Sequence, residues 1–488
     1  MKRLIAGYLS LLPWFAFAQV TETPRSAAPV TTPIASPDTT VFSAGVFFEL
    51  IRRNHPIVKQ AGLFGEEARQ ALVQARGAFD PKLVSYYDRK EFNRNLYFDH
   101  WQNKLTVPLW LGGVDLNVSY DRNSNRGKYI NPEELTPSSG LTGVGLSVPI
   151  GQGLLIDARR NAVRQARLAG DLAEADRLKL VNKIVFDAAK TYWEWFFAHR
   201  QRQLLTEGYE LADLRFRALR ERALIGDAAF IDTTEALITV QDRLVQRQQA
   251  EVDEQNARLL VSTFLWNDAN QPVELPATAV PEQPFLTPPD DGAFQLLLDR
   301  ATNLHPELLK LTAKNQQLTL EERFRRAMIQ PQIMLNASLL SATPNPDIRY
   351  DLRKYYEFRP ENHKISVDMV FPLFLRKERG KLREIQLENQ QVVLERQQVS
   401  RDITNGVQSA YNQLQALARQ VDTQQQTILN QQRLVAAELQ KFELGESSLF
   451  LINTRETKLI DLRVKGEELK TKYQKAVAEL YFVAGTGQ

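Results

Sequence analysis

The chain has 488 residues, a formal net charge of +3 and no cysteine. This length allows one elongated domain or two to three compact ones. The balanced charge argues against a nucleic-acid-binding protein. The lack of cysteine excludes disulfides, thiolate metal sites, a thiol nucleophile and a lipid-modified N-terminal cysteine.

The N-terminus has the pattern of a secretory signal peptide. Lys2 and Arg3 precede an apolar run over Leu4–Phe17, and Ala16 and Ala18 are the small residues that a signal peptidase reads. We predict a signal peptide over residues 1–18, cleaved after Ala18. The alternative is a membrane anchor, for which the apolar run is short. We therefore expect an exported protein.

Residues 19–42 are rich in Pro, Thr, Ser and Ala and predict a flexible leader. Helical spacing follows over Phe42–Phe79, with an interruption at Pro56 and an end before Pro81. The period then changes to two, which predicts strands over 113–122 and 141–149. Residues 83–89 and 101–109 also alternate, less regularly.

Helical spacing returns from Asp157 to about Glu221, followed by a glycine turn at Gly226 and a second helix to Trp266. The aromatic cluster over Tyr192–Phe197 is expected to pack between helices. Residues 267–290 contain six prolines and predict an irregular connector.

The second half repeats this plan, with strands over 332–341 and 363–371. Matching residues recur in the same order in both halves: His55 and His305, Pro56 and Pro306, Pro81 and Pro331, Pro149 and Pro372, Tyr192 and Tyr411, Gly226 and Gly445. We therefore predict an internal duplication, with one repeat over 43–266, a second over 291–484, and a short tail over 485–488.

The segment after Pro372 predicts a helix of about 65 residues, roughly 100 Å long. Its apolar residues recur every seven positions, at Val407, Leu414, Val421, Ile428, Val435 and Phe442. A repeat of seven indicates a left-handed coiled coil with a neighbouring helix. Gly445 ends this helix and a return helix runs towards Phe482.

The four regular strands are each about nine residues long, enough for a tilted strand to cross the apolar layer of a membrane. One face of each is apolar and the other is Asp, Asn, Ser or Gly. Four strands cannot close a barrel, and open edges are not tolerated in lipid. We therefore expect protomers to pool their strands, with three protomers giving 12.

At these residues the chain resembles the TolC-type outer-membrane efflux proteins, over nearly all of the mature sequence. The resemblance depends on the order of the motifs in both halves: Asn54-His55-Pro56 and Leu304-His305-Pro306, Pro81 and Pro331, Ser147-Val148-Pro149 and Val370-Phe371-Pro372, and the turns at Gly226 and Gly445.

The resemblance implies a mixed α and β membrane protein: a homotrimer with a 12-stranded outer-membrane β-barrel, four strands per protomer, continued by a periplasmic α-helical barrel. Residues 267–290 would be the equatorial connector. The protein would be a passive conduit of a tripartite efflux pump or a type I secretion system. Its partners would be outer-membrane lipid, a periplasmic adaptor and, through the adaptor, an inner-membrane transporter.

The resemblance also implies site residues. The turns at Gly226-Asp227 and Gly445-Glu446 would be periplasmic tips where an adaptor docks. Asp232 and Glu235 match the positions of entrance carboxylates in the family. The same positions of the second repeat are Leu451 and Thr454, so an acidic ring is absent there, and Asn453 and Glu456 are nearby but out of register. An alternative for Asp232 and Glu235 is a favourable charge at a helix N-terminus.

The segment 82–110 departs from the family pattern, since it is either an added hairpin or part of the barrel. No catalytic residues, metal ligands or cofactor motifs emerge, so an enzyme is not expected. Two other classes remain as alternatives: a secreted coiled-coil scaffold without a pore, and a periplasmic adaptor. The scaffold does not explain the duplicated strand pairs, and an adaptor usually has one helical hairpin and a lipoyl-like domain.

Overall fold

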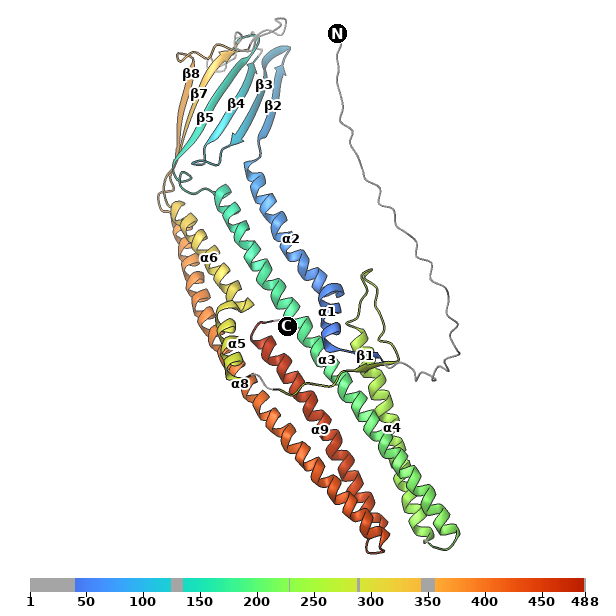
Figure 1. The fold of residues 1–488 in the computed structure, drawn as a ribbon. Coiled ribbons are helices and arrows are strands. Elements are labelled where there is room, and N and C mark those ends of the chain that lie inside the picture. The colour runs from blue at the N-terminus through green and yellow to red at the C-terminus, as the bar shows by residue number, and fades with distance from the viewer. Residues whose placement is uncertain (1–39, 124–134, 228, 288–289, 344–355, 487–488) are drawn as a thin grey trace, which may run out of the picture.

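The computed structural model describes residues 40–123, 135–227, 229–287, 290–343 and 356–486. The expected signal peptide and residues 19–39 of the leader lie outside these ranges. The molecule is elongated, with a sheet at one end, long helices along its length, and two helical hairpins whose tips form the other end (Figure 1).

The helices repeat once along the chain, as the sequence predicts. The first set is α1 (Ala44–Asn54), α2 (Pro56–Arg76), α3 (Ala158–Leu224) and α4 (Phe230–Ser262), with a single 3₁₀ turn, Gly77–Phe79, after α2. The second set is α5 (Asp291–Leu304), α6 (Pro306–Ala327), α8 (Arg376–Glu443) and α9 (Leu449–Val483). The predicted break at Pro56 separates α1 from α2.

A histidine starts the second helix of each repeat. His55 and His305 have nearly the same extended backbone, and the Nδ1 atom of each accepts a hydrogen bond of 3.2 Å from the backbone N–H two residues later. The following proline occupies the first helical position, where its missing N–H costs nothing. Burial lowers the pKa of both imidazoles, so both stay neutral and able to accept.

A tyrosine anchors the long helix of each repeat to the short helices. Tyr192 of α3 stacks on Phe47 and donates its hydroxyl to the Phe42 carbonyl at 2.7 Å. Tyr411 of α8 stacks on Phe294 at 3.9 Å and donates to Asp291. The aromatic cluster around Tyr192 is therefore packing between helices, as predicted.

Among the described residues, six strands form one antiparallel sheet, in the order β2-β3-β4-β5-β7-β8. The strands are β2 (Lys82–Phe92), β3 (Asn95–Pro108), β4 (Asp115–Asn123), β5 (Leu141–Gly151), β7 (Gln332–Ala342) and β8 (His363–Val370). The four regular strands lie where the sequence predicts them, β4, β5, β7 and β8. The expected count of four strands per protomer is wrong, because 82–110 supplies β2 and β3.

The register gives this sheet two different faces. Continuous cross-strand rows of apolar residues cover most of one face, among them the row Val107, Leu116, Leu146, Ala337, Ile365 and the row Leu83, Leu105, Val118, Val144, Leu339. The next row away from the helices, Ser85, Asn103, Tyr120, Thr142, Ser341, is polar apart from the tyrosine ring. The opposite face carries polar and small residues, as in the row Lys82, Thr106, Asn117, Gly145, Ser338, Lys364. Such a division suits a sheet with lipid on one side and water on the other.

The connector between the repeats is tied to the start of the first repeat. A short strand β1 (Thr40–Phe42) pairs in parallel with β6 (Ala279–Pro281). The last residues of the expected flexible leader are thus ordered, because their backbone groups pair with the connector.

Four helices lie side by side at each level below the sheet. Near the sheet, α2 packs on α3, α3 on α6, and α6 on α8; nearer the tips, α3 packs on both α4 and α9, and α9 on α8 (Figure 1). The predicted heptad positions Val407, Leu414, Ile428 and Val435 are buried in α8. Within the described residues, no helix has both the length and the apolar character needed to cross a membrane.

Candidate functional site: the hairpin tips and the sheet–helix junction

The two tips share one turn geometry. Gly226 and Gly445 have φ values of +80° and +78°, which favour glycine over any residue with a Cβ. In each turn the next residue, Asp227 or Glu446, donates its backbone N–H at 2.8 Å to a carbonyl five residues earlier. Arg222 also donates to the Asp227 carboxylate at 2.8 Å. The predicted turns are present, and their role in docking stays a prediction.

Large apolar side chains at both tips are exposed to solvent. They belong to the last turn before each glycine and the first turn after it: Leu224, Ile225, Phe230, Ile231, Leu444 and Phe450. Isolated exposed apolar residues are ordinary, whereas a group of them is typical of an interaction surface.

The two candidate entrance carboxylates lie in the first turns of α4. Both are partly exposed, and Asp232 lies within the first turn, where a negative charge favours the helix. Glu235 lines a groove between α4 and α9 together with Thr454, Thr457 and Asp461. Thr454 is exposed and Leu451 lies on the same helix, so the second repeat adds no acid at these positions.

A buried ion pair joins the two hairpins above the tips. Arg215 of α3 donates from both terminal nitrogens to the two carboxylate oxygens of Glu456 of α9, one bond measuring 2.6 Å. The side chains are only 17% and 6% exposed. Glu456 therefore faces another helix and does not line an entrance. Sequence reasoning placed Glu456 near the tip and missed Arg215, because the pairing of α3 with α9 is not readable from either helix.

A second arginine lies in the same interface. Arg243 of α4 is buried and donates to Thr457 at 3.3 Å. Burial lowers its pKa, an effect that the negative charge of Glu456 opposes. Gly208 of α3 makes room, since a Cβ there would lie 2.9 Å from the Arg243 guanidinium and 2.7 Å from Ile460. Glu456 thus acts on two buried arginines, and the negative charge of Asp461 also favours the charged form of Arg243.

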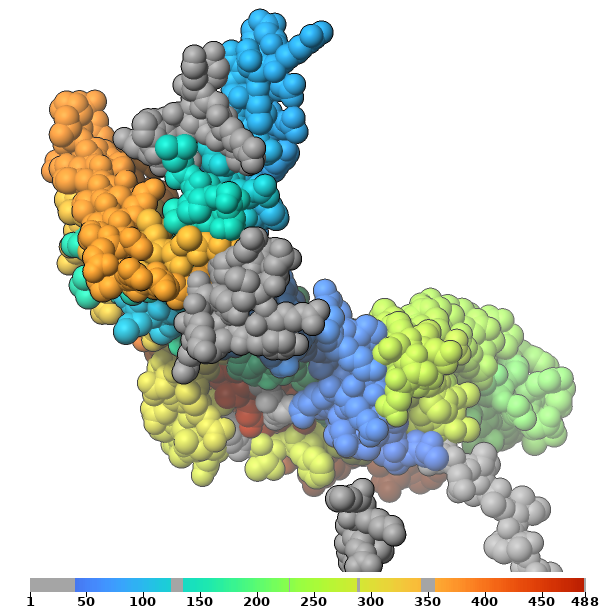
Figure 2. Space-filling model, turned by 90° about the horizontal axis from the view of Figure 1, so that it is seen from above, coloured from blue at the N-terminus to red at the C-terminus, as the bar shows by residue number. Residues whose placement is uncertain are grey.

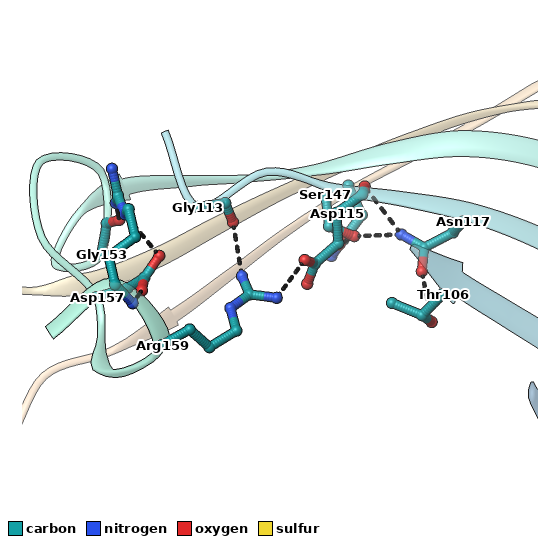
Figure 3. Close-up of polar contacts among 10 residues, drawn as sticks. Thr106, Gly113, Asp115, Asn117, Ser147, Gly153, Asp157 and Arg159 are labelled. Carbon is teal, nitrogen blue, oxygen red and sulfur yellow. Dashed lines mark hydrogen bonds and ion pairs between the residues drawn. The ribbon is translucent and has the colours of Figure 1, made fainter. Parts of the chain in front are cut away.

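A different arginine ties the sheet to the long helix at the other end. Arg159, in the first turn of α3, donates to Asp115 of β4 at 2.6 Å and to the Gly113 carbonyl at 3.2 Å (Figure 3). Its guanidinium also lies over the ring of Phe79, which packs on Trp110. The β3–β4 turn is therefore fixed to the ends of both α2 and α3.

A chain of side-chain hydrogen bonds crosses the polar face of the sheet. Thr106 donates to Asn117 at 3.0 Å, Asn117 to Ser147 at 2.9 Å, Ser147 to Asn336 at 2.6 Å, and Asn336 to Ser366 at 3.3 Å. It joins β3 to β8 through every strand between them, and Figure 3 shows its first members beside the Arg159 contacts. Side-chain hydrogen bonds thereby link the strands of both repeats across the polar face.

The second repeat matches a known protein family. The family model described as "Outer membrane efflux protein" matches residues 297–486, from α5 to the end of α9. No curated sequence matches the chain closely enough to count as a relative.

Solved structures match almost the whole chain. The outer membrane channel MtrE of Neisseria gonorrhoeae matches with 15% identity and a TM-score of 0.64, over 91% of this chain and 89% of that one. CmeC of Campylobacter jejuni gives 14% and 0.62, over 91% and 86%. VceC of Vibrio cholerae gives 13% and 0.61, over 91% and 96%. At such identities the likeness concerns the fold.

The fold, with its helical plan repeated once along the chain, is that of the TolC-type outer-membrane channels. The second repeat thus matches the outer membrane efflux protein family in sequence, and the first repeat shares its helical plan.

Proposed function

We propose that the protein is a homotrimeric, passive conduit for export, the outer-membrane component of a tripartite efflux pump or a type I secretion system. The observation that carries this proposal is the two-faced sheet, apolar on one side and hydrogen-bonded on the other, continuous with helices on both repeats. An apolar outer face and a polar inner face are what a membrane pore requires.

The open edges of the sheet support assembly from several copies. Among the described residues β2 and β8 each pair with a strand on one side only. Unpaired backbone groups are costly in lipid, so the sheet must be closed by other copies of the chain. A scaffold without a pore would gain nothing from an exposed apolar face on this sheet.

The tips support an adaptor as the periplasmic partner. Channels of this family function in tripartite pumps. The exposed apolar residues beside Gly226-Asp227 and Gly445-Glu446 suit docking of an adaptor, which would connect the conduit to an inner-membrane transporter. Asp232 and Glu235 are proposed entrance carboxylates, with Glu235 facing the groove between the hairpins.

Planar-bilayer recordings test the pore directly. We expect the purified trimer to form discrete channels, with larger conductance in a variant loosened at the tips, such as Glu456→Gln. A matched variant, Glu207→Gln, removes an exposed α3–α9 ion pair with Arg463 and should leave the conductance unchanged. Absence of channels from both variants and from the parent protein would exclude a conduit.

A further inference from the structure

The hairpin formed by β2 and β3 has no counterpart in the second repeat, where α6 leads directly into β7 and β8. It is nevertheless a full part of the sheet. β3 pairs with β4 over nine residues, from His100↔Asn123 to Pro108↔Asp115. Seen from the sheet end, β2 and β8 lie at opposite ends of the sheet (Figure 2).

The hairpin also continues both faces of the sheet. On the apolar face, Leu83 faces Leu105, and Trp101 packs edge-on to Tyr120 of β4 with ring centroids 5.7 Å apart. On the polar face, His100 of β3 bonds to Asp121 of β4 at 2.6 Å. A hairpin lying outside a barrel wall would not continue both patterns.

The base of the hairpin is fixed as well. The β3–β4 turn is held by Arg159 through Gly113 and Asp115 and by the contact of Trp110 with Phe79. The hairpin is therefore attached to the same two helices, α2 and α3, that support the rest of the first repeat.

From these contacts we infer that all six strands of each copy belong to the barrel wall, and that β2 of one copy pairs with β8 of the next. The inference deepens the proposed function, on which it depends. Six is an even number, so β2 and β8 run in opposite directions and can close the ring as an antiparallel pair. Three copies then give a barrel of 18 strands.

The stagger of the strands fits this closure. The cross-strand row that starts at Lys82, the first residue of β2, reaches Lys364, six residues before the end of β8 at Val370. At the helix end of the sheet, Gly151 of β5 pairs with Gln332 of β7, and Gln332 pairs with Val370 of β8. We therefore align Lys82 of one copy with Val370 of the next at this end of the sheet. The six residues between Lys364 and Val370 are then the stagger over six strands, or one residue per strand, the ratio found in barrels with a strand tilt of about 36°.

At a strand tilt of about 36°, the width of the helical layer agrees better with six strands than with four. At a spacing of about 4.8 Å and a tilt of about 36°, six strands occupy roughly 36 Å of circumference, and four occupy roughly 24 Å. The four helices below them, about 8–10 Å apart, occupy roughly 32–40 Å. Six strands per copy therefore continue the helical wall without a step.

The same alignment places complementary residues across the seam between copies. Asp88 of β2 faces Lys364 of β8 on the polar face, and Tyr86 faces Ser366 beside them. On the apolar face, Tyr87 comes opposite Ile365. An opposite-charge pair and an aromatic–β-branched pair are both favourable across antiparallel strands.

Disulfide crosslinking distinguishes the possible seams, because the chain has no cysteine of its own. The variant with Tyr86→Cys and Ser366→Cys should form covalent dimers and trimers in the outer membrane. The matched variant with Ser119→Cys and Ser366→Cys tests the alternative, in which β4 pairs with β8 of the next copy and the hairpin lies outside. In the 18-stranded barrel these two positions are roughly 14 Å apart, too far for a disulfide.

We expect at least tenfold more crosslinked product from the Tyr86 pair than from the Ser119 pair. The Asp88→Cys and Lys364→Cys pair should crosslink equally well and confirm the register. Crosslinking through Ser119 alone, or no crosslinking from any pair in protein that still runs as a trimer and exports substrate, would overturn the seam while leaving the conduit intact. Loss of the trimer and of channels in the parent protein would instead overturn the proposed function.

Discussion

The two repeats share their helices and differ in their strands. Each has a histidine-capped helix, a tyrosine-anchored long helix and a glycine tip, yet the first repeat contributes β2 to β5 and the second only β7 and β8. The shared parts are those that set the length and curvature of the helical wall. The added hairpin widens the sheet of the first repeat by pairing along β4, and its contacts with the helices lie at the β3–β4 turn.

We expect the largest effect from removing the hairpin β2–β3, which makes the first repeat like the second. Deleting residues 82–113 joins Pro81 to Val114, as Pro331 joins β7. We expect at least a tenfold loss of outer-membrane trimer, because the deletion removes the seam strand and one of the two Arg159 hydrogen bonds, the one to Gly113. The measurement is heat-sensitive trimer on gels of isolated outer membranes. A deletion protein that assembles and exports normally would mean that four strands suffice.

The buried ion pair between the hairpins gives the next largest effect. Glu456→Gln removes the carboxylate that binds Arg215 and acts on Arg243, while both arginines stay buried, which should cost about 3 kcal/mol. Amide hydrogen exchange in the tip halves of α3 and α9 should quicken by more than about a hundredfold. Glu207→Gln, in the exposed pair with Arg463, should cost less than about 1 kcal/mol. Equal exchange in the two variants would contradict a structural role for the burial.

Substitutions at the two tip glycines compare the contribution of each repeat to export. Gly445→Val and Gly226→Val each meet open space, so their cost is backbone strain of about 1–2 kcal/mol. We expect impaired export with normal membrane insertion, measured as accumulation of a pump substrate alongside trimer content. Gly380→Val, in the helical part of α8 and also in open space, is the control. A tip variant that exports as well as this control would rule out docking at that tip.

The histidine caps give the smallest effect, and one that depends on pH. Burial lowers the pKa of His55 and His305 in the folded protein below the usual 6.5. Their stabilisation is therefore complete above pH 6.5, and it is lost as the pH falls from 6.5 through the folded pKa, at about 1 kcal/mol per cap.

Hydrogen exchange of α2 and α6 at pH 7.5 and 5.5 measures this loss. Replacing both residues, His55→Asn and His305→Asn, keeps a capping side chain that does not titrate. The double variant should lose the pH dependence and retain the stability. A pH dependence that persists in it would assign the effect to other groups.

Much of this architecture is predictable from the chain because its signals are local. The histidine–proline helix starts, the regular strands and the glycine turns each depend on a few neighbouring residues. The duplication strengthens the prediction of the fold, since each signal occurs twice. The long helix with its heptad repeat is predictable for the same reason.

The rest depends on contacts between distant segments. β2 and β3 alternate poorly because Ser85, Arg89 and Asn103 lie on the apolar face, so the place of these strands in the sheet appears only once β3 is paired with β4. Arg159 and Arg215 look like ordinary helical arginines in the sequence. Their partners Asp115 and Glu456 are 44 and 241 residues away, and no periodicity indicates them.

The unpaired edge strands β2 and β8 have a consequence for biogenesis. In a single copy inserted into lipid, the outer backbone groups of β2 and β8 would lack hydrogen-bond partners. Membrane insertion and trimer assembly are therefore expected to occur together. The yield of channels should then increase more than linearly with the amount of protein made. At low expression, unassembled copies would remain in the periplasm, exposed to its proteases.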